Sequence, residues 1–77
     1  MDIQKEALIS VKLGSKSVTQ VTNEVLDLMT GSIDLAGAGM VLGGTHRDLD
    51  IVADTQEELD NFLGLLKVRG YNFKIQA

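Results

Sequence analysis

Residues 33–53 read IDLAGAGMVLGGTHRDLDIVA, and this stretch decides the fold. Two segments of strand type, 33–42 and 49–53, flank a glycine-containing turn. In the second segment apolar residues alternate with polar ones, which is the pattern of a strand with one buried face. The stretch therefore predicts a β-hairpin in the middle of the chain.

On each side of this hairpin a helical pattern of apolar residues lies next to the hairpin, and a strand-like pattern lies beyond it. Upstream, residues 7–13 alternate like a strand, and a helical stripe follows in Val18, Val21, Val25 and Leu28. Downstream, a helical stripe of Leu59, Phe62, Leu63 and Leu66 precedes a strand-like segment at 71–76. Apolar steps of three and four predict helices, whereas steps of two predict strands. The predicted order of elements is therefore β-α-β-β-α-β.

Capping signals agree with these helix boundaries. Ser17 with Gln20, and Thr55 with Glu58, have the spacing of a capping box, in which each residue's side chain bonds the other's free N–H. Gly31 stands where the first helix needs a left-handed stop.

Two strand-helix-strand halves indicate an α+β fold, the ferredoxin-like split β-α-β sandwich (βαββαβ). Right-handed crossovers then give a four-stranded antiparallel sheet with strand order 4-1-3-2 and two helices on one face. The chain contains no proline and no linker-like tract, so we expect residues 1–77 to form a single domain.

The hairpin segment 33–42 departs from clean alternation. If the odd-numbered residues of both hairpin strands share the core face, opposed residue numbers sum to an even number. This requires an odd number of residues in the loop and places Gly37 and Gly39 on the core face. Glycines there either let a helix approach closely or mark a β-bulge, and both interpretations stay open.

The opposite face of that strand predicts an interface. It carries Ala36, Ala38, Met40 and Leu42, on the sheet face that the two helices leave uncovered. An uncovered apolar edge strand tends to aggregate unless it is paired or covered. We therefore expect this strand to belong to a contact surface; the alternative is a partly exposed patch of small residues.

The second helix offers another candidate interface. At about 100° per residue, the side away from its core stripe carries Asn61, Gly64, Leu65 and Val68. A glycine inside a helix costs about 1 kcal/mol relative to alanine, which close contact with a second helix would explain. The alternative is a site that tolerates glycine.

The hairpin turn is a candidate ligand or partner loop, made of Gly43, Gly44, Thr45, His46 and Arg47. Its backbone N–H groups and arginine could cradle an anion; the alternative is a turn that uses glycine for its backbone angles. Thr45 beside His46 is the nearest approach to a nucleophile and base, but a solvated hairpin tip is the favoured interpretation.

Composition excludes several classes of function. The chain has 77 residues, no cysteine, one histidine and a net charge of −4. These counts exclude disulfides and thiolate metal sites, and an acidic chain is not expected to bind nucleic acid. Asp48, Asp50 and Asp54 lack the glycine and final glutamate of a calcium loop. No apolar run reaches a membrane span of about 18 residues and no signal-peptide core is present, so we expect a cytoplasmic protein with no membrane contact and no cofactor.

Three segments resemble the ACT family of small-molecule regulatory domains, namely Gly31-Ser32-Ile33-Asp34, the helix entry from Asp54 to Leu59, and Gly70-Tyr71-Asn72-Phe73. The resemblance implies a regulatory module that holds a small molecule between subunits near Gly14–Ser17. ACT domains often carry proline before the glycine of this turn, whereas here the turn reads Gly14-Ser15-Lys16-Ser17.

The sequence thus leads to two expectations about function. The first is a small acidic, non-enzymatic binding or regulatory protein that forms a homo-oligomer, with a dimer favoured, and docks on a protein partner. An inhibitor or adaptor encoded by a mobile element would fit this description. The second is the ACT-like module that binds a small molecule between subunits.

Overall fold

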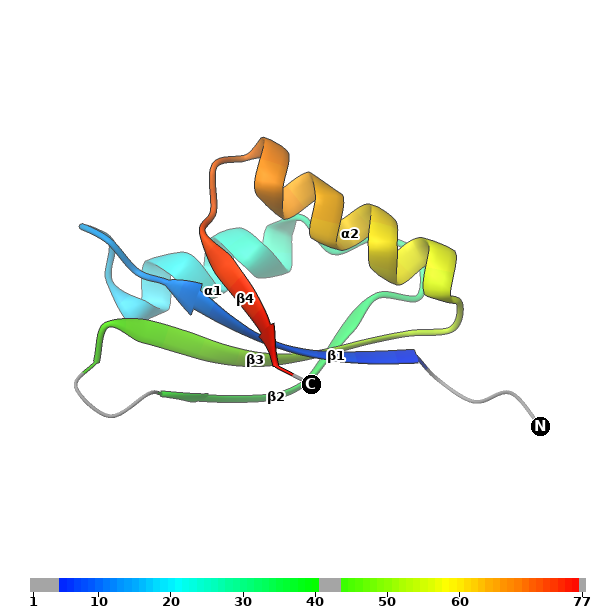
Figure 1. Cartoon of the computed structure of the whole chain (residues 1–77), viewed down its shortest axis with the longest axis horizontal. Coiled ribbons are helices and arrows are strands. Elements are labelled where there is room, and N and C mark those ends of the chain that lie inside the picture. The colour runs from blue at the N-terminus through cyan, green and yellow to red at the C-terminus, as the bar shows by residue number, and fades with distance from the viewer. Residues whose placement is uncertain (1–4, 41–43, 77) are drawn as a thin grey trace.

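A computed structural model describes residues 5–40 and 44–76, with the side chain of Met40 left out (Figure 1). Its elements are β1 (Lys5–Lys12), α1 (Val18–Asp27), β2 (Asp34–Met40), β3 (His46–Ala53), α2 (Gln56–Val68) and β4 (Phe73–Gln76). The predicted order β-α-β-β-α-β is confirmed. The fold is of the α+β class.

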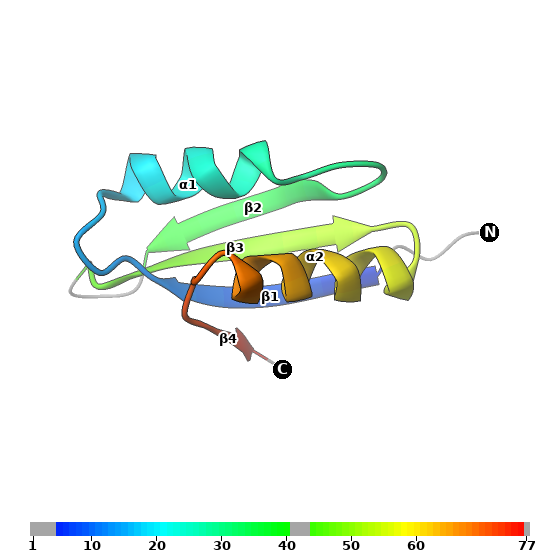
Figure 2. The same cartoon turned by 90° about the horizontal axis from the view of Figure 1, so that it is seen from above.

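The strands form one antiparallel sheet in the order β2-β3-β1-β4 (Figure 2). This is the predicted order, with β1 and β3 in the centre. β1 pairs with β3 along its whole length, from Lys5 opposite Ala53 to Lys12 opposite His46. β4 pairs with only four residues of β1, from Leu8 to Val11. Among the described strands, β2 and β4 each have one unpaired outer edge.

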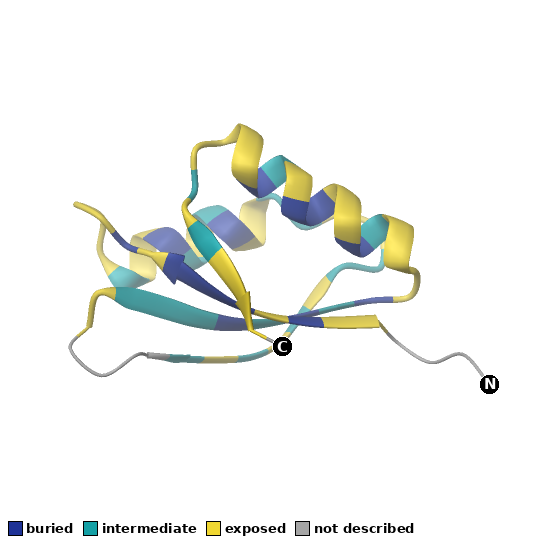
Figure 3. Ribbon diagram, viewed as in Figure 1, coloured by how far each residue is buried: buried dark blue, intermediate teal, exposed yellow. Residues whose placement is uncertain are grey.

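Both helices cover the same face of the sheet, as expected (Figure 1). The core lies between the two layers and is seen as the dark blue inner side of the helices and central strands in Figure 3. Its fully buried large side chains are Ile9, Val11, Val21, Val25, Leu49, Ile51, Leu59 and Leu66. We call the other side of the sheet the open face.

The helix caps follow the sequence prediction only in part. Ser17 and Thr55 are N-caps whose side chains accept hydrogen bonds from the backbone N–H of Gln20 and Glu58. The Glu58 carboxylate, however, accepts bonds from the backbone N–H and the hydroxyl of Ser32. Glu58 therefore links the loop before β2 to α2, because Ser32 in that loop offers two hydrogen-bond donors to its carboxylate.

The predicted register of the hairpin is wrong beyond its first residues. Asp34 lies opposite Val52 and Leu35 opposite Ile51, but Gly37 lies opposite Asp50. The register shifts between Leu35 and Gly37, so Ala36 is the extra residue of a β-bulge. Of the two interpretations of the glycines, the bulge is confirmed.

The bulge reverses the face of the residues that follow it. Directly opposed residues of antiparallel strands point to the same side, so Ala38, opposite Leu49, belongs to the helix-covered side. Gly37 and Gly39, opposite Asp50 and Asp48, belong to the open face. The predicted faces of these three residues were therefore wrong. Beyond the bulge, opposed residue numbers sum to an odd number. The loop between β2 and β3 therefore has an even number of residues, whereas an odd number was predicted.

Candidate functional site

The outer edge of β2, which we call the β2 edge, is unpaired among the described strands. Ala36 and Ala38 are exposed, whereas Leu35 is half-buried. Met40 lies opposite Arg47 in the register, its side chain is outside the description, and Leu42 lies outside the described residues. The structure thus retains the predicted strand as a candidate interface, through its edge and not through an apolar open face.

This edge lacks the usual protection of an edge strand. Natural sheets guard such edges with lysine, proline or short length, because unpaired N–H and C=O groups recruit other strands. β2 is seven residues long, and its sequence DLAGAGM has one charged residue, Asp34, at its start. The bulge at Ala36 interrupts the strand near its start and is one feature that protects such an edge. From Gly37 to Met40 the pairing with β3 is regular.

An apolar residue of α1 flanks the same edge. The Arg47 side chain donates from Nε to the hydroxyl of Thr22 (3.1 Å) and from Nη1 to the carbonyl of Gly39 (3.3 Å). This bridge places the Thr22 side of α1 above β2. Leu26 lies one turn further on the same side and is 41% exposed. Periodicity did not single out Leu26, although an apolar residue outside the predicted core stripe is a usable signal.

The bulge places two glycines beside a pair of carboxylates on the open face. Asp48 and Asp50 lie beside Gly39 and Gly37, where no β-carbon covers the backbone. One carboxylate oxygen of each aspartate is buried without a hydrogen-bond partner among the described residues. Asp50 also raises the pKa of Glu6, by hydrogen bonding and by charge repulsion. Sequence alternation predicted both aspartates on this face, but not the glycines beside them.

The predicted set on α2 divides between two surroundings. Asn61 and Leu65 border a cavity of about 200 Å³ against the loop that joins α1 to β2. Gly64 has open space where a β-carbon would lie, and Val68 is 83% exposed. Asn61, Gly64 and Val68 are thus exposed, whereas Leu65 is half-buried. Its role in an interface stays a prediction.

The hairpin turn offers little chemistry in its described part. Gly44 and Thr45 are exposed, and Gly43 lies outside the described residues. The Thr45 hydroxyl lies 2.9 Å from Nδ1 of His46. Among the described residues no carboxylate orients the His46 ring, which a catalytic base of this kind would need. The Arg47 side chain is already engaged with α1 and β2.

A polar cluster joins α1 to the loop before β4. Glu24 accepts hydrogen bonds from the Tyr71 hydroxyl and from Lys16 Nζ (2.7 Å). Burial and the bond to Glu24 raise the pKa of Tyr71 to about 12. The bonds from Lys16 and Tyr71 lower the pKa of Glu24. Lys16 also lies over the Tyr71 ring, 5.1 Å from its centre, so the cluster holds this end of the molecule together.

Charge is distributed unevenly along the strand direction. Five of the seven lysine and arginine residues line two cavities at the end where α2 finishes and β4 begins: Lys12, Lys16, Lys67, Arg69 and Lys74. We call this the basic end. β1 and β2 begin at the opposite end of the molecule, where β3 ends and α2 starts. This end carries Glu6, Asp34, Asp54, Glu57 and Glu58. We call this the acidic end.

Two features are absent from the described residues. No helix in the described ranges is long and apolar enough to cross a membrane. No group of three or more histidine, cysteine, aspartate or glutamate residues in that part of the chain is arranged to hold a metal ion.

Comparison with known proteins gives no family for this chain. No family model matches it, and searches of curated proteins and of solved structures found no match either.

Proposed function

We propose that this chain is a non-enzymatic binding protein that pairs with a second copy of itself through the β2 edge. The observation that carries the proposal is the unpaired outer side of β2, which lacks both lysine and proline. Two such edges would pair antiparallel around a two-fold axis and extend the sheet across both copies. Exposed Leu26 would then flank the shared edge.

The charge distribution favours the antiparallel arrangement. β2 runs parallel to β1, since both pair antiparallel with β3, so β2 starts at the acidic end and finishes near the basic end. Antiparallel pairing of two β2 strands sets the acidic end of each copy beside the basic end of the other. A parallel arrangement would bring like charges together. Charge therefore favours antiparallel pairing of two β2 edges over parallel pairing.

Sedimentation equilibrium of the wild type and two lysine variants tests this proposal. A monomer has a mass of 8.3 kDa, and we expect the wild type to sediment at twice that mass. Ala38→Lys should raise the dissociation constant of the dimer about tenfold or more, because it places a charge on the shared edge. Ser15→Lys, in the exposed turn before α1, adds the same charge away from that edge and should leave the dimer unchanged. A monomeric wild type, or equal effects of both variants, would contradict the proposal.

A second function, the ACT-like module, has one supporting observation. A cavity of about 320 Å³ borders the turn at Gly14, Ser15 and Lys16, with Arg69 and Tyr71 on its other side. A thermal-shift series with the proteinogenic amino acids tests it, because saturation at 100 times the dissociation constant stabilises a fold by about 2.7 kcal/mol. No shift with any of them would reject this candidate.

The strand order and the two helices on one face support a ferredoxin-like sandwich, which both functions would use.

A further inference from the structure

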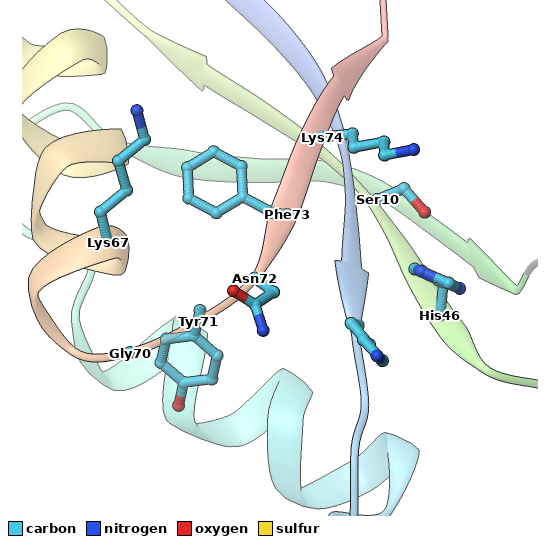
Figure 4. Close-up of a pocket in the computed structure, with 9 residues that line it drawn as sticks. Ser10, His46, Lys67, Gly70, Tyr71, Asn72, Phe73 and Lys74 are labelled. Atoms are coloured by element: carbon cyan, nitrogen blue, oxygen red, sulfur yellow. The ribbon is translucent and has the colours of Figure 1, made fainter.

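The second edge of the sheet differs in charge from the β2 edge. A cavity of about 470 Å³ surrounds the beginning of β4, the strand whose outer side is unpaired in the described sheet. In Figure 4, Lys67 and Phe73 lie on the α2 side of β4, whereas Lys74, Ser10 and His46 lie on the other side. The residues that line the cavity therefore lie on both faces of the sheet around the beginning of β4, and Ser10, Lys12 and His46 come from β1 and β3.

The residues that line this cavity carry basic groups and no carboxylate. They include Lys12, Lys67, Lys74 and His46, together with the polar side chains of Ser10 and Asn72. Three lysines around one cavity are unexpected in a chain whose net charge is −4. A cleft lined by one sign of charge concentrates ligands of the opposite sign.

The nearby end of α2 does not cancel this positive charge. A helix C-terminus carries partial negative charge on its last carbonyl groups. Here the carbonyls of Leu65, Leu66 and Lys67 accept bonds from the N–H groups of the three residues that follow the helix. Lys67 in the last turn opposes what remains of the dipole.

We infer that the β4 edge binds an extended acidic segment of a partner protein, which adds as a strand beside β4. Side chains of an added strand alternate between the two faces of the sheet. Acidic side chains on one face would meet Lys67, and those on the other would meet Lys74 and Lys12. The free backbone groups of β4 would supply the strand hydrogen bonds.

Charge also disfavours a second copy at this edge. β4 is only four residues long, so in a pair of β4 strands Lys74 of each copy would lie near Lys74 of the other, and like charges on opposed strands are unfavourable. The two edges thus differ in occupant: the β2 edge suits its own copy, and the β4 edge suits an acidic partner. This inference goes beyond the proposed pairing through the β2 edge and uses other residues, so either can fail alone.

The experiment is an NMR titration of the ¹⁵N-labelled full chain with a blocked octapeptide of glutamate and valine, Ac-EEVEEVEE-NH₂. The same peptide with glutamine in place of glutamate is the charge control, and sodium tripolyphosphate is the control for a simple polyanion. We expect the acidic peptide to shift the backbone amide signals of Phe73–Gln76 and to slow hydrogen exchange there. The glutamine peptide should bind at least ten times more weakly.

Protein variants then locate the site. The double variant K67Q/K74Q should lose the peptide-induced shifts, whereas Lys5→Gln removes an exposed lysine near the opposite end of β1 and should keep them. Absence of shifts at millimolar peptide, equal binding of the glutamine peptide, or shifts confined to β2 would overturn the inference. Tripolyphosphate shifts as large as those of the peptide, without slower exchange in β4, would also overturn it, because they would show a polyanion site without strand addition.

Discussion

At the scale of single residues, Tyr71 reports on its surroundings more directly than any other side chain. It is the only tyrosine and the chain has no tryptophan, so its ionisation can be followed by ultraviolet absorbance. Burial and its bond to the Glu24 carboxylate both favour the neutral phenol. Because of Tyr71, the free energy of unfolding therefore depends on pH in the alkaline range.

We expect Tyr71 to titrate at about 12 in the folded protein and near 10.0 in denaturant. A raised folded pKa means that stability is complete below pH 10 and is lost as pH rises toward about 12, because only the unfolded chain ionises easily in that window. Glu24→Gln should lower the folded value. An unchanged value in this variant, or a wild-type titration near 10, would show that the cluster does not form in solution.

Two glycines with the same backbone angle should differ in their cost of substitution. Gly14 and Gly31 both have φ of 62°, which costs a residue with a side chain about 1–2 kcal/mol. A β-carbon at Gly14 meets nothing within 4 Å, but at Gly31 it would lie 3.3 Å from the Glu58 carboxylate oxygen that accepts from Ser32. Urea unfolding should therefore show a larger loss for Gly31→Ala than for Gly14→Ala. Equal losses would mean that the contact between Glu58 and Ser32 does not stabilise the fold.

At the scale of elements, the bulge in β2 determines which residues face which side. Because a strand has a period of two, one extra residue at Ala36 moves every later residue to the other face. Ala38 is thereby turned to the helix-covered side, and two glycines are left on the open face.

Deleting Ala36 should leave a folded protein with a regular hairpin, because Gly37 already lies opposite Asp50, next to the pair of Leu35 and Ile51. The amide spectrum should change around β2 and stay the same in α2. The straighter edge should also dimerise more strongly, since bulges protect edge strands. A spectrum that changes throughout the sheet would show that the deletion shifts the whole register and that the bulge is not at Ala36.

The elements themselves were predictable from sequence, and the departures have physical reasons. Periodicity predicted both helices, all strands and their order, because burial of one face imposes a repeat on each element. A bulge needs a single extra residue, so the pattern around Ala36 gave no unique position for it. The bond from Ser32 to Glu58 joins residues 26 positions apart, which no local signal reveals. The cavity at β4 gathers Lys12, Lys67 and Lys74 from three elements, and only the fold brings them together.

At the scale of the whole molecule, the separation of charge between the two ends governs association. The acidic and basic ends lie at opposite ends of the strands, and a net charge of −4 conceals this separation. Two copies that pair antiparallel place unlike ends together at both ends of the shared edge. Such attraction between exposed charges is sensitive to salt.

The dissociation constant of the dimer should therefore rise several-fold with salt, because the Debye length falls from about 30 Å at 0.01 M to about 3 Å at 1 M. Sedimentation equilibrium across a sodium chloride series measures this. An apolar interface would instead tighten or stay unchanged in high salt. That outcome would contradict the role of charge while leaving the shared edge in place.

Pairing through the β2 edge is the central claim, and cysteine cross-linking tests it most directly because the natural chain has no cysteine. Residues 35–39 are each replaced by cysteine in separate variants and oxidised under native conditions, with Ser15→Cys, in an exposed turn, as the control. A disulfide needs Cα atoms about 4.4–6.8 Å apart, and antiparallel strands meet this distance where a residue faces its own copy across the two-fold axis. We predict that disulfide-linked dimer forms most at one position in 35–39, declines on either side of it, and is absent with Ser15→Cys. Equal cross-linking at every position, or cross-linking through Ser15→Cys alone, would contradict the account.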